Sequence, residues 1–566
     1  MKRLLILGCT GILTACGGDG SEPSREAFCT EALTAVATFM EQARATYPTP
    51  DDARYGGTVV VGNYAEIGDG MNAAVSSDNT GRQHQQFVNL MTLIDYDERF
   101  EPRPYLAESW ELEPDSTSIT FRLREDVLWH DGERTDAHDV AFTWETINDP
   151  VTGYPNVATL QYFEKGPAGF EVLDDFTIRI HMQPHPQFMD AFRSIAMLPE
   201  HLLGDVPHDQ LGQHPFGTQC PVGNGPFVFE SHRPQDRWIF AANPVFPEGL
   251  GGRPFVDRYV YRVITEQTTL LTELLTENVD VYMGPAPEQA PQIIDDPNLE
   301  LGTSVARQYN FVGWNARRPQ LSDARVRRAL TMGTDRDRIV EAVVQGYGSV
   351  AHSGVPPFHW AYDPTAIDPI RYDPDGARAL LDEAGWRDRD GDGVRESADG
   401  TRLSISIKYN ANQVRQQVAE IMQSQLAQIG VEVQPRMVEW TTLVEQMTSS
   451  DNRDFDGVVM GWVVDFELDD TELFHSDNID QPLAMSGTQN PEIDRLVEEL
   501  RVIADREVAR PLWTEYQRLI VQEQPYTYFY FPQRLAGINN RLQGLVMDAR
   551  GEWVNLKDWY LDPASR

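Results

Sequence analysis

Strand-forming and helix-forming segments alternate along this chain without a fixed repeat period. Residues 259–264 and 279–283 are rich in the valine and tyrosine typical of strands, and residues 266–276 between them predict a helix. A strand, a helix and a second strand in this order predict a βαβ unit, whose strands are parallel. Because no period repeats, we expect mixed α/β lobes and neither a barrel nor a repeat array.

The same alternation continues through the second half of the chain. A length of 566 residues, with 41% hydrophobic residues, allows several globular lobes with separate cores. Gly430 is placed to end a long helix, and an aromatic run after residue 525 predicts a late strand. We expect helices over 26–47, 414–429, 491–504 and 507–522, and strands over 58–61, 119–123, 402–409, 431–433, 458–462 and 526–531.

The first residues predict export and a lipid anchor. Lys2 and Arg3 precede the apolar run 4–7, and small residues lead to Cys16. A charged and then apolar start is typical of a secretory signal, and this one resembles that of bacterial lipoproteins. The resemblance implies a signal peptide over 1–15 and lipidation of Cys16. Since no stretch reaches the roughly 18 apolar residues of a spanning helix, we expect membrane attachment by the lipid alone.

Charge and cysteine content narrow the partners and the compartment. The 47 Lys and Arg residues against 87 Asp and Glu residues give a net charge of −40. Such a surface repels phosphate backbones, so we expect no nucleic-acid partner. Of the four cysteines, Cys9 leaves with the signal peptide and Cys16 carries the lipid, so Cys29 and Cys220 remain. They form either one disulfide or two independent thiols, and the sequence leaves both alternatives open.

Common enzyme motifs are missing from this chain. No lysine follows a glycine, which excludes a Walker A loop, and none of the 12 histidines precedes a glutamate, which excludes the His-Glu-x-x-His zinc signature. There is no Cys-x-x-Cys and no Gly-x-Ser-x-Gly. His181 and His185 lie beside prolines in a predicted loop, either as metal ligands or as ordinary surface histidines. We therefore expect no enzyme and no required cofactor.

An acidic stretch over 388–399 has the spacing of a calcium loop. Carboxylates stand at positions 1, 3, 5, 9 and 12, and Gly393 stands at position 6. The segment that follows alternates like a strand, so this is not an ordinary EF-hand. The alternative is a hairpin turn in which Asp and Gly satisfy the backbone. The candidate ligands of a structural calcium ion are Asp388, Asp390, Asp392, Val394, Glu396 and Asp399.

A series of short motifs follows a fixed order between residues 57 and 545. They include 106–110 (Leu-Ala-Glu-Ser-Trp), 129–132 (Trp-His-Asp-Gly), 223–227 (Gly-Asn-Gly-Pro-Phe), 310–315 (Asn-Phe-Val-Gly-Trp-Asn) and 461–465 (Gly-Trp-Val-Val-Asp). Each motif alone is weak. Their order and spacing resemble those of the bacterial family 5 extracellular solute-binding proteins, the peptide-type receptors of ABC importers.

This resemblance implies an α/β fold of the periplasmic binding protein type, class II, cluster C. Two main lobes with mixed sheets are joined by a hinge, an extra domain lies beside the first lobe, and the solute is trapped between the lobes. The closed form then docks on a membrane permease. The implied domains are a tether and helix over 16–56, lobe I over 57–88, 218–308 and 536–566, accessory domain II over 89–217, and lobe III over 309–535.

The candidate binding residues follow from the chemistry of a closed cleft. A buried ligand ammonium must meet a carboxylate or lose several kcal/mol. In peptide-binding relatives the aspartate of the Gly-Trp-x-x-Asp segment holds the peptide's α-amino group. In this sequence that aspartate is Asp465. The alternative is that Asp465 is an exposed loop carboxylate. Trp462 can pack on the solute, and Trp314 with Asn315 can line the crossing between the lobes, although such aromatic residues also suit a core. Tyr409 stands near the place where dipeptide-binding relatives carry an arginine, so dipeptide specificity is not implied.

The sequence favours one function and leaves others open. The first is a lipid-anchored monomeric receptor, in the periplasm or on the outer face of the cytoplasmic membrane, that binds oligopeptides and delivers them unchanged to an ABC permease. The second keeps the fold but binds an oligosaccharide, haem or a metal chelate. A surface hydrolase and a purely structural lipoprotein are the alternatives of other classes.

Overall fold

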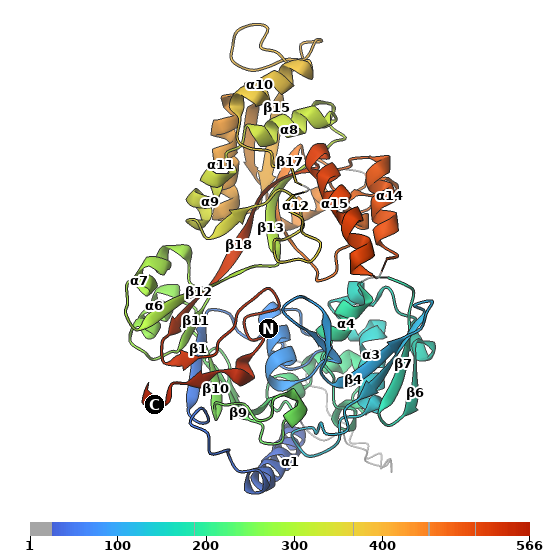
Figure 1. The fold of residues 1–566 in the computed structure, drawn as a ribbon, viewed down its shortest axis with the longest axis vertical. Helices are drawn as coiled ribbons and strands as arrows, with labels where there is room; N and C mark the ends of the chain where they lie inside the picture. The colour runs from blue at the N-terminus through green and yellow to red at the C-terminus, as the bar shows by residue number, and fades with distance from the viewer. Residues whose placement is uncertain (1–24, 186, 366, 451–452, 504, 566) are drawn as a thin grey trace, which may run out of the picture.

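The computed structural model describes residues 25–185, 187–365, 367–450, 453–503 and 505–565. The predicted signal peptide and Cys16 lie outside these residues. The molecule consists of two bodies stacked along its longest axis (Figure 1). None of the described helices is long and apolar enough to cross a membrane. The helices are α1 Arg25–Thr46, α2 Asn79–His84, α3 Ala137–Asn148, α4 Phe188–Ser194, α5 Glu200–Leu203, α6 Gln267–Leu275, α7 Ala290–Ile294, α8 Ala324–Met332, α9 Arg336–Val344, α10 Pro374–Glu383, α11 Gln413–Ala427, α12 Trp440–Thr448, α13 Thr471–Phe474, α14 Pro491–Leu500 and α15 Arg506–Glu523.

One sheet runs through both bodies in the order β16-β15-β17-β13-β18-β11-β1-β10-β9-β8, and β12 and β14 also pair with β18. A separate sheet, β4-β5-β7-β6, and the pairs β2-β3 and β19-β20 complete the described strands. The strands are β1 Thr58–Asn63, β2 Ile94–Tyr96, β3 Pro102–Pro104, β4 Ala107–Leu112, β5 Ser118–Leu123, β6 Phe170–Asp174, β7 Thr177–His181, β8 Phe227–Arg233, β9 Arg237–Ala242, β10 Arg258–Val263, β11 Val281–Met283, β12 Leu299–Val305, β13 Gln308–Trp314, β14 Gly348–Val350, β15 Ser404–Tyr409, β16 Glu432–Met437, β17 Gly457–Val463, β18 Tyr526–Asn539, β19 Leu542–Gln543 and β20 Tyr560–Leu561.

We call the body around β13, β15 and β17 the upper lobe, the body around β1, β10 and β11 the lower lobe, and the part around β4–β7 the accessory domain. Strand β18 crosses from the upper lobe to the lower lobe (Figure 1). Its first half pairs with β13, and its second half pairs with β11 and β12. The chain crosses a second time between β12 and β13. Because both crossings lie beside the domain boundaries at 308/309 and 535/536, we propose the domain ranges given above for this structure.

The predicted βαβ unit is confirmed. Strands β10 and β11 both pair in parallel with β1, which lies between them, and α6 connects them. The predicted helix over 491–504 is shorter in the structure, where α14 ends at Leu500. The chain turns there so that α15 can pack against α14.

The N-terminal helix α1 belongs to the folded body. Cys29 and Cys220 form a disulfide with their Cα atoms 5.3 Å apart, which is one of the two alternatives that the sequence left open. Val36 and Met40, one turn apart on α1, are buried in the core that includes the accessory domain. The disulfide closes a loop across 191 positions of the sequence. It therefore constrains the unfolded chain strongly and holds α1 on the lower part of the molecule.

Candidate ligand-binding site

A cavity of about 490 Å³ lies between the lobes. Its walls come from the segment after β17, from the accessory domain around α4, and from the lower lobe around α2. The two crossings contribute Arg307 and Arg534. Small-molecule sites occupy roughly 300–1,000 Å³, so this cavity can enclose a solute. A larger hollow of about 890 Å³ follows the exposed face of α1. It is lined almost entirely by that one helix, so it cannot surround a ligand.

Strand β17 brings Asp465 to the cavity. The strand ends at Val463, and the next residue is fixed to the crossing on both sides: the Val464 amide donates to the Arg307 carbonyl at 3.0 Å, and Arg307 Nη1 donates to the Val464 carbonyl at 2.7 Å. Asp465 lines the cavity and makes no hydrogen bond or ion pair within the part of the chain that the structure describes. Its carboxylate is free to receive a ligand.

The environment of Asp465 disfavours its charge. The pKa of the carboxyl is raised to about 6. Burial is the main cause, the nearby carboxylates of Asp190 and Asp469 contribute to the rise, and Arg307 offsets part of it. The side chain is accessible to solvent, yet protein surrounds it on most sides. Both observations agree with a carboxylate that faces a small cavity and not bulk water. A cation in the cavity would relieve this unfavourable charge.

We predict that Asp465→Asn stabilises the ligand-free protein at neutral pH. The folded-state pKa of about 6 lies above the unfolded value, so the carboxylate destabilises the fold increasingly as pH rises from about 4 to about 6. Asparagine removes that charge and keeps the shape. Thermal denaturation at about pH 7.5 and at about pH 4.5 should show a higher melting temperature for the variant at the first pH and a smaller difference at the second. An unchanged or lower melting temperature at neutral pH would contradict the raised pKa.

The neighbouring acids of this segment have partners within the protein. Arg506 binds Glu467, whose pKa burial raises to about 7. Asp469 Oδ2 lies 3.0 Å from His185 Nε2 of the accessory domain, and Asp470 accepts from the Tyr516 hydroxyl. These three acids hold the segment in place. Asp465 has no such partner among the described residues.

Three arginines gather in the cavity wall. Nε of Arg193, Nε of Arg307 and Nη1 of Arg534 are buried and donate no hydrogen bond to any described residue. The pKa of Arg307 is lowered to about 10, mainly by burial and also by repulsion from Arg193 and Arg534. Buried donors without acceptors are uncommon in folded proteins. An anionic or acceptor group of a ligand beside these three guanidinium groups would relieve the repulsion between them.

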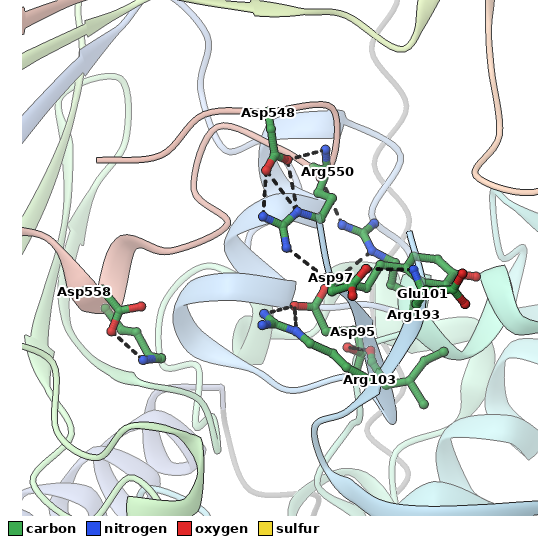
Figure 2. A network of polar contacts seen from close by, with 12 residues as sticks. Asp95, Asp97, Glu101, Arg103, Arg193, Asp548, Arg550 and Asp558 are labelled. Atoms are coloured by element: carbon green, nitrogen blue, oxygen red, sulfur yellow. Dashed lines mark hydrogen bonds and ion pairs between the residues drawn. The ribbon is translucent and has the colours of Figure 1, made fainter. Parts of the chain in front are cut away.

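A network in the wall fixes Arg193 and Arg550. Figure 2 shows Asp95 between Arg103 and Arg193, at 2.5 Å from Arg103 Nη2 and 3.6 Å from Arg193 Nε. Asp548 pairs with Arg550 at 2.6 Å (Figure 2), and Arg193 Nη2 donates to the Arg550 carbonyl at 3.0 Å. The arginine side of the cavity is therefore positioned before any ligand enters.

Phe466 connects the upper lobe to the accessory domain. Its ring lies between two guanidinium groups, 4.3 Å from Arg193 and 4.0 Å from Arg307. It also packs on Tyr96 and Phe100 of the accessory domain, each at 5.2 Å between ring centroids. With Ala549 of the lower lobe these residues form a small apolar cluster. The lobes are thus in contact beside the cavity.

The structure brings Asp465 and Trp462 to the cavity but not the other three predicted binding residues. Trp314 is fully buried, and its indole Nε1 donates to Thr527 Oγ1 at 3.0 Å. Asn315 is buried and donates to main-chain carbonyls, and Tyr409 is buried in the same core as Trp314. These three residues pack inside the upper lobe, which for the aromatic residues is the core alternative that the sequence left open.

The predicted calcium ligands are only partly brought together. Asp388, Asp390, Asp392 and Glu396 form a cluster, which Asp399 does not join. Asp399 instead accepts from the Thr401 amide at 3.1 Å and from the Ser397 hydroxyl, because residues 397–401 make a tight turn. Val394 lies between the third and fourth cluster residues. In the histidine pair considered as metal ligands, His185 already contacts a carboxylate, because its Nε2 lies 3.0 Å from Asp469 Oδ2.

Sequence reasoning missed the arginines of the cavity. Arg307 and Arg534 lie on the two crossings, so charged residues beside the predicted lobe boundaries were a usable signal. Arg193 and Asp190 lie on α4, which only the tertiary fold brings to the cavity. No local motif marks them.

The sequence profile described as "Bacterial extracellular solute-binding proteins, family 5 Middle" matches residues 101–478. The chain belongs to family 5. The resemblance drawn from the ordered motifs is thereby confirmed. Family 5 proteins are extracytoplasmic solute-binding receptors of transporters and not enzymes.

Known relatives of this family 5 protein cover most of its length. The oligopeptide-binding protein AppA of Bacillus subtilis is 31% identical over 512 residues, which are 89% of this chain and 92% of AppA. Heme-binding protein A of Haemophilus influenzae is 27% identical over 467 residues, 79% of this chain and 82% of that protein. Similarity thus extends to relatives named for different solutes.

Solved structures agree with the predicted fold class. The structure of AppA from Bacillus subtilis in complex with a nonapeptide matches with a TM-score of 0.69 and 29% identity, covering 90% of this chain and 99% of that one. The substrate-binding protein CtaP of Listeria monocytogenes matches with a TM-score of 0.76 over 90% of this chain and 100% of that one, at 20% identity. The second match supports the fold alone.

Proposed function

We propose that this protein is the extracytoplasmic receptor of an ABC importer and binds oligopeptides between its lobes. The observation that carries the proposal is the composition of the cavity wall. It contains Asp465, a carboxylate without a hydrogen bond or ion pair among the described residues, and the guanidinium groups of three arginines, Arg193, Arg307 and Arg534. A ligand with one ammonium group and several carbonyl or carboxylate oxygens satisfies both sets. Peptides have this chemistry. The similarity to AppA supports the same ligand class.

Asp465 would receive the peptide's α-ammonium group. Closing the cavity removes water from both charges, so the pair strengthens as the lobes approach. Arg307 and Arg534, on the two crossings, would receive oxygen atoms of the peptide. Trp462, beside Asp465 in the wall, would pack on a side chain or on the peptide backbone.

Lobe closure would couple binding to transport. Phe466 and the contacts of Glu467 join the upper lobe to the accessory domain: the Glu467 amide donates to Asp190 at 3.3 Å, and Gln187 Nε2 donates to the Glu467 carbonyl at 2.8 Å. A ligand that bridges the lobes favours this closed arrangement over an open one. The permease would then recognise the closed form. The peptide leaves unchanged, which makes this chain a receptor and not an enzyme.

A lipid anchor would keep the receptor at a membrane surface. Cys16 would carry the lipid that holds the protein in the periplasm or on the outer face of the cytoplasmic membrane. The receptor would act as a monomer beside its permease. Cys16 lies outside the described residues, so this anchor rests on the sequence of the signal.

Native mass spectrometry on purified residues 17–566 tests the proposed ligand class. The protein should carry small molecules that leave on denaturation, and their masses should form a heterogeneous set of peptides. One homogeneous solute, such as haem, a metal chelate or an oligosaccharide, would contradict peptide binding and support a different solute on the same fold. Hydrolysis of added peptides by the pure protein would contradict the receptor function itself.

A further inference from the structure

We propose that the loop over residues 388–396 binds one calcium ion, which has a structural role separate from the solute site. The loop connects α10 to β15 at the far end of the upper lobe (Figure 1). None of the cavity-lining residues belongs to it. The site is therefore independent of the proposed function.

The geometry of four carboxylates fits this ion. One oxygen from each of Asp388, Asp390, Asp392 and Glu396 lies within 4.8 Å of the others. Calcium binds oxygen ligands at about 2.3–2.6 Å, so ligands on opposite sides of the ion are about 4.6–5.2 Å apart. The four carboxylates can thus surround one calcium ion with little movement. Backbone carbonyls and water can complete its six to eight ligands.

The burial of Glu396 is a second observation, separate from the closeness of the four carboxylates. Glu396 is 6% exposed, whereas the three aspartates are exposed, and its carboxylate is turned towards them. Its Oε2 accepts from the Arg389 amide at 3.0 Å, but its buried Oε1 accepts no hydrogen bond from any described residue. A buried carboxylate oxygen without a partner is unfavourable. A cation among the aspartates would satisfy it.

The loop keeps this arrangement through its own backbone. The amides of Gly391 and Gly393 donate to the two oxygens of Asp388 at 2.7 Å and 3.1 Å. Both glycines have φ angles in the left-handed region, +81° and +91°, which side chains disfavour. Each aspartate oxygen retains a further lone pair for a metal. The chain then pairs Glu396 with Arg387 and with Arg402, so a hairpin stands where an EF-hand has its second helix.

Charge and ligand type favour calcium over magnesium. Arg402 pairs with Asp392 at 2.5 Å and neutralises part of the cluster, which leaves an excess of negative charge. Magnesium demands near-ideal octahedral geometry and retains most of its water, whereas a loop of carboxylates suits the flexible coordination of calcium. An exported protein meets calcium at high concentration, and sites in extracellular modules bind it with Kd on the order of 10⁻⁴–10⁻³ M.

Isothermal titration and thermal denaturation of EDTA-treated residues 17–566 test this site, with CaCl₂ as the added probe. We expect one calcium ion per chain, and a melting temperature that rises by about 2 °C when calcium exceeds Kd about 100-fold. Magnesium at the same concentration should give a smaller shift. No heat of binding and no shift with calcium, or an equal shift with magnesium, would overturn the proposal.

Asp390→Asn and Asp399→Asn make a matched pair of variants. Both residues are exposed aspartates that accept a main-chain amide, at 3.1 Å in each case, and asparagine preserves that hydrogen bond. Only Asp390 belongs to the cluster. Calcium affinity should fall at least about tenfold in Asp390→Asn and stay unchanged in Asp399→Asn. If the two variants bound calcium with equal affinity, whether unchanged or reduced, the ion would not be held by this cluster.

Discussion

Replacing Asp465 with asparagine is expected to weaken the binding of a peptide with a free amino terminus by about 1.5–3 kcal/mol, which is roughly a 10- to 150-fold rise in Kd. The carboxylate has no partner within the described residues, so the variant removes the ligand's counter-charge without breaking an internal contact. Isothermal titration with a pentapeptide selected on the wild-type protein from a synthetic library measures the change.

Asp477→Asn is the control for this prediction. Asp477 is an exposed aspartate of the upper lobe that does not line the cavity, so the same chemical change there should leave peptide affinity unaltered. If Asp465→Asn bound the pentapeptide as tightly as the control variant, Asp465 would have no place in the binding site.

Phe466→Ala is expected to weaken peptide binding by about 2–4 kcal/mol, a loss of tens-fold to several hundred-fold. The ring is 4% exposed and is covered by residues of the accessory domain and of the crossing. An open form would expose it, so its removal disfavours the closed form selectively. Small-angle scattering of the ligand-free protein should show a larger radius of gyration for the variant, and titration should show the loss of affinity.

Phe466→Leu separates closure from folding. Leucine retains apolar volume but not the ring that lies between the two guanidinium groups, so its effect should be intermediate. The melting temperature should change less than the affinity in both variants, because Phe466 belongs to a cluster formed across domains. A Phe466→Ala protein with wild-type affinity and wild-type radius of gyration would show that this contact does not control closure.

The order of elements could be predicted because it depends on local patterns. Local patterns identified β1, β10, α6 and β11, and the order strand, helix, strand predicted that β10 and β11 are parallel. The position of β1 between them came only from the structure. The extent of β18 could not be predicted in the same way. Its second half pairs with strands from a different lobe, and that pairing is a tertiary property.

The alternation of side chains along β13 explains why Trp462 lines the cavity and Trp314 does not. Trp462 pairs in register with Tyr309, and both residues line the cavity. Trp314 lies five positions after Tyr309 on the same strand, and an odd spacing puts it on the opposite face of the sheet. There it packs in the other core of the upper lobe. Knowledge of which face meets the cavity was needed to choose between them, and the sequence does not contain it.

Of the charged residues that line the cavity, some could be predicted from the sequence and others could not. Asp465 could be identified because it follows a strand within a recognisable motif. Arg193 comes from α4 of the accessory domain and meets the loop after β17 across a domain boundary. Its role depends on how the domains pack, for which a single sequence gives no signal.

Peptide binding through a free amino terminus is tested most directly by comparing two forms of one ligand pool. A synthetic pentapeptide library without lysine, and the same library after acetylation of its amino termini, are titrated into wild-type residues 17–566. We expect the free library to bind at least about tenfold more tightly, because acetylation removes the ammonium group that would meet Asp465. Equal affinity for the two libraries, or no binding of either, would contradict the proposed binding mode.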